Sequence, residues 1–466
     1  MYEHDTIAAI ATPPGHGGVA ILRISGVHAE SIAQTLFFPK QPWEQLHSHH
    51  LYLGRIVDPR TGSSLDQAML AVMRAPHSYT GENVAEIHCH GGSFLAQRIL
   101  EALLNQGARL ALPGEFTKRA FLNGRLDLSQ AEAVQDLIQA KSEGGVQLAW
   151  NQLTGRLSEQ CGTIRERLIR LTAHVEAFLD FPEDDVPERT QQEFAHDLSS
   201  LINTIAHLHA TFSQGKVYRD GVRTAIIGKP NVGKSSLLNA LAGTERAIVT
   251  AQPGTTRDVL EETILINDIP LVVWDTAGLR TAIDEAERIG VERARAGIQQ
   301  AELVLAVFDA ARPFDAEDQV VCESVIGKTI LPILNKVDLP HKNNAAEIEI
   351  MLGIGTPVHV SAKNGTGFDE MKDRISELIL GTQGPSLLEE GQQGQTAVVT
   401  RVRHRDALIK AEYCLTHALE SLQAGLPLDL IAVDLRAGLD HIGEITGHVS
   451  NEDILDQIFR EFCIGK

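Results

Sequence analysis

The sequence predicts a multidomain α/β protein in which a Ras-like, doubly wound α/β domain is inserted into a split all-helical domain. Three patterns support this prediction. Strands and helices alternate between Val222 and Ser361, apolar residues follow helical spacing in residues 129–215 and 401–466, and short strands separated by turns fill the first 120 residues. We expect domain segments at residues 1–120, 121–218, 219–380 and 381–466.

The bulk composition is ordinary for a globular protein. The 466 residues are 43% hydrophobic and 22% charged, with no N-terminal signal and no apolar run of the roughly 20 residues that a membrane span needs. Five scattered cysteines argue against a disulfide framework and for a reducing cytoplasm. The net charge of −20 means that a nucleic acid partner would need a local basic face.

The first 120 residues have the pattern of an α+β domain. Gly and Pro punctuate short runs of strand-forming residues, and a helix is expected after Gly91-Gly92. The expected strands are Ile7–Ala11, Val19–Ile24, Leu51–Val57, Ala68–Met73 and Val84–His88.

The two helical segments lie on either side of the α/β segment. Each has apolar residues three and four positions apart, as at Leu168, Leu171 and Val175, but neither has a self-contained core. We therefore expect the two segments to pack together, with a linker after Gly381.

A phosphate-binding pattern opens the α/β segment. Gly228-Lys229-Pro230-Asn231-Val232-Gly233-Lys234-Ser235 fits G-x-x-x-x-G-K-[ST], follows an apolar strand and precedes a helix. In such a loop, backbone N–H groups curl around phosphates, the lysine reaches the β- and γ-phosphates, and the serine hydroxyl binds Mg²⁺. Lys234 and Ser235 are the corresponding residues, and the neighbouring contacts are Asn231, Val232, Gly233 and Ser236.

Three further motifs end the following strands. In the first, the Asp275 carboxylate can hold Mg²⁺ through water, and Gly278 can meet the γ-phosphate. In the second, Asp338 can accept hydrogen bonds from N1–H and the 2-amino group of guanine, donors that adenine does not present together. The motifs predict a GTP/GDP site, and their residues are Asp275, Thr276, Ala277 and Gly278; Asn335, Lys336 and Asp338; and Ser361, Ala362 and Lys363.

These motifs resemble the TrmE–Era–EngA group of GTPases. The resemblance assigns Gly254-Thr255-Thr256-Arg257-Asp258 to switch I, with Thr256 as a second Mg²⁺ ligand. Leu279 stands where Ras-like GTPases carry a water-orienting glutamine. The resemblance therefore implies a bound K⁺ held by Asn231, Thr250, Gln252 and Thr255, and a water-positioning Glu287. The rest of this loop, Ala251, Pro253 and Gly254, is expected to line the nucleotide.

Outside the GTPase motifs, the chain resembles the MnmE (TrmE) family of tRNA-modifying GTPases. The resemblance rests on Asp5–Pro13, Tyr79–Asn83, His88–Gly92, Pro113–Thr117, Asp180–Glu183 and Cys463–Lys466. It implies an N-terminal folate-binding-like domain, a homodimer formed through that domain, and a flavoprotein partner, MnmG. It also implies addition of an aminomethyl-type group to the wobble uridine of certain tRNAs, with a 5-formyltetrahydrofolate-type cofactor as the one-carbon donor.

The same resemblance assigns folate contacts to Arg23, Glu82, Arg125 and Lys466. Arg125 stands where some relatives have lysine, so the charge is retained but the geometry can differ. The resemblance places Cys463 near the folate as a participant in chemistry, whereas the alternative is a cysteine that packs at a helix end.

Some alternatives remain open at this point. A ribosome-assembly or regulatory GTPase of the Era/EngA type would share the nucleotide motifs but would have no use for folate. Arg165–Arg170 and Arg401–Arg405 are either tRNA-facing charges or solvated helix faces. Strand alternation should separate Cys89 from His88 and His90, which argues against a zinc site.

Overall fold

The computed structural model describes residues 5–41, 46–180, 191–244, 261–274, 299–341, 345–353, 356–381, 397–449, 452–460 and 462–466. The chain divides into two compact units. Unit 1 comprises Met1–Gln135, Gln152–Leu201 and Lys410–Lys466, and unit 2 comprises Asp136–Asn151 and Ile202–Ile409.

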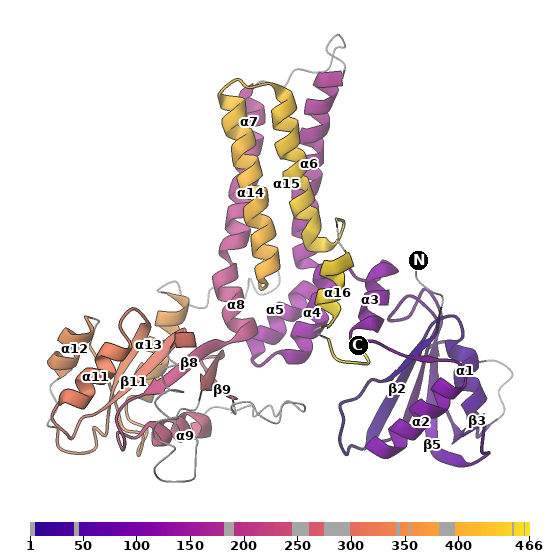
Figure 1. The fold of residues 1–466 in the computed structure, drawn as a ribbon, viewed down its shortest axis with the longest axis horizontal. Coiled ribbons are helices and arrows are strands. Elements are labelled where there is room, and N and C mark those ends of the chain that lie inside the picture. The colour runs from indigo at the N-terminus through magenta and orange to yellow at the C-terminus, as the bar shows by residue number, and fades with distance from the viewer. Residues whose placement is uncertain are drawn as a thin grey trace. The chain divides into compact units, whose positions relative to one another are not determined.

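Unit 1 contains a seven-stranded sheet in the order β3-β4-β5-β6-β2-β1-β7. Neighbouring strands are antiparallel except for the parallel pair β1 and β7. Helices α1 (Ala29–Leu36) and α2 (Ser93–Asn105) lie against this sheet (Figure 1). Their buried Ile32, Ile99 and Leu103 share one apolar core with its strands. The strands are β1 Ile7–Ile10, β2 Val19–Ser25, β3 Phe37–Pro39, β4 Leu51–Val57, β5 Ser64–Met73, β6 Val84–His90 and β7 Arg109–Leu110.

Long helices from distant parts of the chain pack together. Within unit 1, α6 (Arg156–Asp180) lies alongside α15 (Leu428–Thr446), and α16 (Glu452–Arg460) packs against α3 (Glu115–Leu122). Their apolar faces follow helical spacing, so each face needs a partner. The other helices outside the α/β segment are α4 Leu128–Gln139, α5 Glu143–Leu153, α7 Gln191–Ala210, α8 Phe212–Asp220 and α14 Val402–Gln423, of which α8 and most of α5 belong to unit 2.

Unit 2 contains a six-stranded sheet in the order β13-β12-β11-β8-β10-β9. Five strands are parallel, as the strand–helix alternation predicts, but the edge strand β9 pairs antiparallel with β10. The strands of the predicted strand–helix alternation are thus parallel, and β9 is an additional edge strand that the sequence did not predict and that a tight turn joins to β10. The strands are β8 Val222–Ile227, β9 Glu261–Ile266, β10 Ile269–Trp274, β11 Leu303–Asp309, β12 Thr329–Asn335 and β13 Val358–Val360.

Helices of unit 2 cover its sheet. The buried Leu237 of α9 and Met371 of α13 share one apolar core with the strands, and Cys322 of α11 and Ile348 of α12 share another. A sheet with separate cores on its faces is the doubly wound arrangement expected from the sequence. The helices are α9 Lys234–Thr244, α11 Ala316–Ser324, α12 Ala345–Leu352 and α13 Phe368–Leu380.

The fold class is thus confirmed, while the domain bounds near 120, 218 and 380 remain predictions. Within the described part of the chain, no helix combines the length and apolarity needed to cross a bilayer.

Candidate functional site

The phosphate loop lies between β8 and α9. At two of its positions neighbouring atoms lie so close to the backbone that only glycine fits. Gly228 has φ +150° and Gly233 has φ +101°. A Cβ at Gly228 would overlap the carbonyl oxygen of Val307, and one at Gly233 would overlap Nδ2 of Asn335. Asn231, at φ +65°, also takes the left-handed conformation, which asparagine tolerates better than most residues.

The Lys234 side chain folds over this loop. Its Nζ donates hydrogen bonds of 2.8 Å to the carbonyl oxygens of Gly228 and Lys229. Burial lowers the pKa of this half-buried ammonium. Lys234 begins α9, with Ser235 and Ser236 exposed in the first turn. An ammonium and a hydroxyl at a helix N-terminus fit a magnesium-bound phosphate chain.

Asn335 joins the phosphate loop to the loop after β13. Its Nδ2 donates to the carbonyl oxygen of Val232 at 2.9 Å, and its Oδ1 accepts from the N–H of Ala362 at 3.0 Å. These two hydrogen bonds hold both ends of the amide in place, as is usual for a buried polar side chain such as Asn335. The sequence motifs after β8, β12 and β13 therefore come together at one sheet edge.

Asp338 is exposed at the same edge. The Ser361 hydroxyl donates to its Oδ1 at 2.7 Å, and this bond lowers the pKa of Asp338. Lys363 is also exposed, in the turn that follows Ser361 and Ala362. A carboxylate fixed by Ser361 fits recognition of two adjacent N–H donors on a purine.

An ion-pair cluster that was not predicted from the sequence lies at the phosphate loop. Nζ of the buried Lys229 lies 2.6 Å from Oδ2 of Asp315 and 2.7 Å from Oδ2 of Asp318. Asp315 also caps α11 by accepting from the N–H groups of Glu317 and Asp318. Lys229 occupies a position where the phosphate-loop pattern allows any residue, so the pattern does not predict this contact.

The two loops expected to complete the nucleotide site lie outside the described residues. They are Thr250, Ala251, Gln252, Pro253, Gly254, Thr255 and Thr256, and Asp275, Thr276, Ala277 and Gly278. Leu279 and Glu287 also lie outside the described residues.

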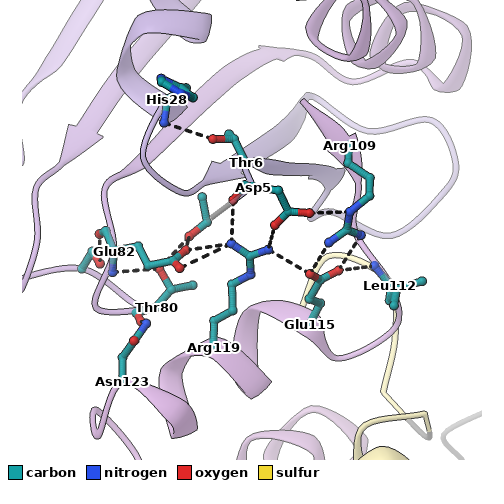
Figure 2. Close-up of polar contacts among 12 residues, drawn as sticks. Asp5, Thr6, His28, Thr80, Glu82, Arg109, Leu112, Glu115, Arg119 and Asn123 are labelled. Carbon is teal, nitrogen blue, oxygen red and sulfur yellow. Dashed lines mark hydrogen bonds and ion pairs between the residues drawn. The ribbon is translucent and has the colours of Figure 1, made fainter. Parts of the chain in front are cut away.

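A second polar cluster lies in the N-terminal domain, around the buried Arg119 (Figure 2). Its guanidinium lies 2.6 Å from Asp5, 3.0 Å from Glu115 and 3.2 Å from Glu82. Arg109 pairs with Asp5 and Glu115 at 2.7 Å each. Arg119 was not among the predicted site residues, because its partners lie up to 114 residues away in the sequence.

Two of the predicted folate contacts come together beside β2. Nε of Arg23 lies 2.8 Å from Oε1 of Glu86, and its guanidinium lies over the ring of Tyr79 at 5.2 Å. The C-terminal segment reaches the same place, because Nη1 of Arg23 donates to the carbonyl oxygen of Gly465 at 3.5 Å. Burial, and after it the charge of Arg23, lower the pKa of Lys466. Cys463 is exposed two residues before Gly465.

The other two predicted contacts have different surroundings. Glu82 accepts from the Ser25 hydroxyl at 2.8 Å in addition to its pairing with Arg119. Ser25 stands two residues after Arg23 on β2, so the two side chains share a face of the sheet. Arg125 is exposed beside Gly81, and the structure gives its guanidinium no contact with the other three residues.

One expectation about basic residues was wrong. Arg401 is only 8% exposed and pairs with Asp136 at 2.7 Å, so it is neither a tRNA-facing charge nor a solvated one. Its partner is 265 residues away, which a local charge pattern cannot reveal. Arg170 in the other basic stretch is exposed, at 76% of its side chain.

The arrangement of His88, Cys89 and His90 agrees with strand alternation. Cys89 is buried, and burial raises the pKa of its thiol to about 11, while His90 is exposed. Among the described residues, no group of three or more His, Cys, Asp or Glu side chains is arranged so that it could hold a metal ion.

Comparison with known proteins covers both units. A model described as the GTP-binding protein TrmE N-terminus matches residues 6–125, and the MnmE helical domain matches residues 128–463. The tRNA modification GTPase MnmE of Acetivibrio thermocellus is 43% identical over 466 residues, which is 100% of both chains. The chain belongs to the MnmE family. MnmE of Moorella thermoacetica is 47% identical over 99% of both chains, and MnmE of Geobacter sulfurreducens is 46% identical over 100% of both.

These full-length matches favour the MnmE alternative over a GTPase of the Era/EngA type. Among solved structures, Era of Aquifex aeolicus is 26% identical, with 41% of this chain and 65% of that chain covered and a TM-score of 0.26. A likeness at that score supports no conclusion about function, whereas the MnmE relatives span the whole sequence.

Proposed function

We propose that this chain is a GTP-hydrolysing tRNA modification enzyme. The observation that carries the proposal is the 43–47% identity, over 99–100% of the chain, to relatives named tRNA modification GTPase MnmE. The contacts among the phosphate loop, Asn335 and Asp338 support the GTP-binding part of the proposal, because they bring phosphate-binding and purine-binding groups to one edge of the sheet.

In this proposal each described residue has a specific task. Backbone N–H groups from Asn231 to Ser235 bind the phosphates, and Lys234 neutralises charge at the β- and γ-phosphates. Asp338 selects guanine, with Ser361, Ala362 and Lys363 supporting the base. Mg²⁺, when bound through Ser235 and Thr256, neutralises the charge that develops on the transferred phosphoryl group.

Leu279 cannot orient water through its apolar side chain, so other elements must orient the water and neutralise the charge of the transition state. We assign the neutralisation of charge to K⁺ held by Asn231, Thr250, Gln252 and Thr255, and we assign Glu287 the positioning of water. A charge of this kind contributes roughly 10³–10⁵ in rate in other GTPases. The test compares GTP turnover in KCl and NaCl at equal ionic strength, and equal rates would exclude a K⁺ requirement.

We assign the N-terminal domain to homodimerisation and to binding of a 5-formyltetrahydrofolate-type cofactor. Arg23, Tyr79, Glu86 and Lys466 support this assignment, because an aromatic ring, two cations and a carboxylate fit a flat heteroaromatic ligand with carboxylate groups. The folate would supply a one-carbon unit, and Glu82, Arg125 and Cys463 remain proposed participants.

The decisive experiment mixes the chain with its flavoprotein partner MnmG, GTP, a formyltetrahydrofolate and unmodified tRNA. Nucleoside analysis should detect an aminomethyl or carboxymethylaminomethyl group on C5 of the wobble uridine. A Cys463→Ser variant with full modification would remove Cys463 from the proposed site. A chain that hydrolyses GTP but neither binds folate nor supports modification would contradict the tRNA-modifying role.

A further inference from the structure

A single carboxylate, that of Asp268, caps the N-terminus of helix α5. Oδ1 of Asp268 accepts from the N–H of Glu143 at 2.8 Å, and Oδ2 accepts from the N–H of Gly144 at 2.6 Å. The next N–H, of Gly145, donates to the Ser142 hydroxyl at 3.0 Å. The first N–H groups of a helix have no partner within the helix, and a negative charge there is favourable. Asp268 is therefore a helix cap supplied from 124 residues away.

Asp268 lies at the tip of the β9–β10 hairpin. The turn residues Asn267 and Asp268 have φ +48° and +66°, as two-residue hairpin turns require, and the strands pair from Ile266–Ile269 to Glu261–Trp274. The six-residue ladder connects the tip to the open end through continuous backbone pairing. At about 3.3 Å per residue, the tip is roughly 20 Å from the open end.

The open end of the hairpin joins the two loops assigned to Mg²⁺ and the γ-phosphate. β9 begins at Glu261, five residues after Thr256, and β10 ends at Trp274, directly before Asp275. No other hairpin in the described chain has this relationship to the nucleotide motifs. Its position means that a change in either loop is applied directly to one of its strands.

Helix α5 in turn connects to the rest of the chain. Leu148 of α5 shares a buried core with Leu271 and Ile264 of the hairpin, and α5 continues at Leu153 into the short turn before α6. A Cβ at Gly145 would lie 2.9 Å from the carbonyl oxygen of Tyr218, so the first turn of α5 packs closely against α8. Asp268 therefore accepts hydrogen bonds from a helix that packs against the same core as the hairpin.

We propose that Asp268 is a positioning residue that couples the nucleotide state to helix α5 through the β9–β10 hairpin. The inference rests on the proposed GTPase function. The two bonds from Asp268 differ in strength between the GDP-bound and GTP-bound chain, because the hairpin is attached to loops that contact the γ-phosphate and Mg²⁺. Linkage then requires that loss of the cap change the relative affinities for GTP and GDP.

The substitution that tests this is Asp268→Asn in the full chain. Asparagine tolerates positive φ, so the turn is retained. Its one oxygen accepts only one of the two N–H groups, and its amide group faces the other. The matched control is Asp373→Asn, which removes an exposed carboxylate 3.3 Å from Nδ2 of Asn267 on the same turn but leaves the α5 cap intact.

The first measurement is calorimetric binding of GDP and of a non-hydrolysable GTP analogue. In Asp268→Asn, the ratio of the two dissociation constants should change by about fivefold or more, the lower end of typical allosteric coupling. In Asp373→Asn it should stay within twofold of the parent chain. A merely structural cap would lower the melting temperature and leave the ratio unchanged, and this result would overturn the inference.

The second measurement uses the parent chain and does not depend on a folded variant. Hydrogen exchange of peptides spanning residues 140–153 should differ between the GDP-bound and GTP-analogue-bound chain. Equal exchange in both states would contradict the coupling. Failure of the parent chain to bind either nucleotide would instead contradict the proposed GTPase function, so the two failures are distinguishable.

Discussion

Lys336 Nζ donates a 2.6 Å hydrogen bond to the carbonyl oxygen of Asn231 and thereby joins the base-recognition loop to the phosphate loop. The same ammonium lies 2.7 Å from Oδ2 of the buried Asp309. Asn231 has a left-handed backbone conformation, and its side chain is the proposed K⁺ ligand. The contact therefore fixes the backbone on which phosphate and cation binding would depend.

Replacing Lys336 by Met should weaken GDP binding by roughly 10- to 100-fold, because a hydrogen bond to a charged group contributes about 1.5–3 kcal/mol. Titration calorimetry with GDP measures the effect. Arg312→Met is the matched control, because Arg312 lies 3.7 Å from the same Asp309 carboxylate. Equal losses in both variants would show that the charge of Asp309, rather than the phosphate loop, determines the effect.

Asp338→Asn should change the purine that is bound. Oδ1 accepts from Ser361, and asparagine can preserve that bond, but its amide group then replaces the second acceptor. The variant should lose at least about 100-fold in GTP affinity, as expected when two charge-assisted bonds are lost. It should gain affinity for xanthosine triphosphate, whose carbonyl at C2 accepts the new amide N–H.

Competition binding with the two nucleotides measures this exchange of specificity. Asp369→Asn, at an exposed position in the first turn of α13, should leave the preference for guanine unchanged. Undiminished GTP affinity in Asp338→Asn would mean that another residue recognises the base.

Local patterns and distant contacts were predictable to different degrees. The phosphate loop was found because its strand, glycines, lysine and helix are contiguous, so one stretch of sequence carries the whole signal. The Asp268–Gly144 and Asp136–Arg401 contacts join residues 124 and 265 positions apart, and no periodicity relates them. The sequence does not predict β9 either, because two glutamates open it and acidic residues are disfavoured in strands.

Asp136→Ala should destabilise unit 2. Oδ1 of Asp136 lies 3.0 Å from Nε of Arg219, just before β8, and 2.7 Å from Nη2 of Arg401, just before α14. One carboxylate, 9% exposed as a residue, thus joins the two ends of the inserted α/β segment. Removing one partner from a buried ion pair costs about 3–5 kcal/mol, because the remaining charges stay buried.

Urea denaturation monitored by hydrogen exchange of β8 peptides would measure this change without assuming that both units unfold together. The control is Glu166→Ala, which removes an exposed partner of Arg170 and should cause no measurable change. A loss of less than about 1 kcal/mol in Asp136→Ala would mean that water or other groups replace the carboxylate.

Glu86→Gln should alter how stability depends on pH. Burial opposes ionisation of Glu86, but the hydrogen bond with His88 and the charge of Arg23 outweigh it and lower its pKa from 4.5 to about 2. A depressed pKa stabilises the folded chain above the unfolded value of 4.5, and this contribution is lost as the pH falls toward 2. Between pH 6 and pH 3.5 the expected loss is roughly 1–1.5 kcal/mol.

Other carboxylates titrate in the same range, so the informative quantity is the difference between the parent chain and Glu86→Gln. The parent chain should lose more stability than the variant on acidification, by that amount, in urea unfolding followed at both pH values. Glu101→Gln, at an exposed position on α2, should lose as much stability on acidification as the parent chain does. If the parent chain and Glu86→Gln lost stability in parallel, folding would not lower the pKa of Glu86, and the Arg23–Glu86 pair would contribute nothing to this pH dependence.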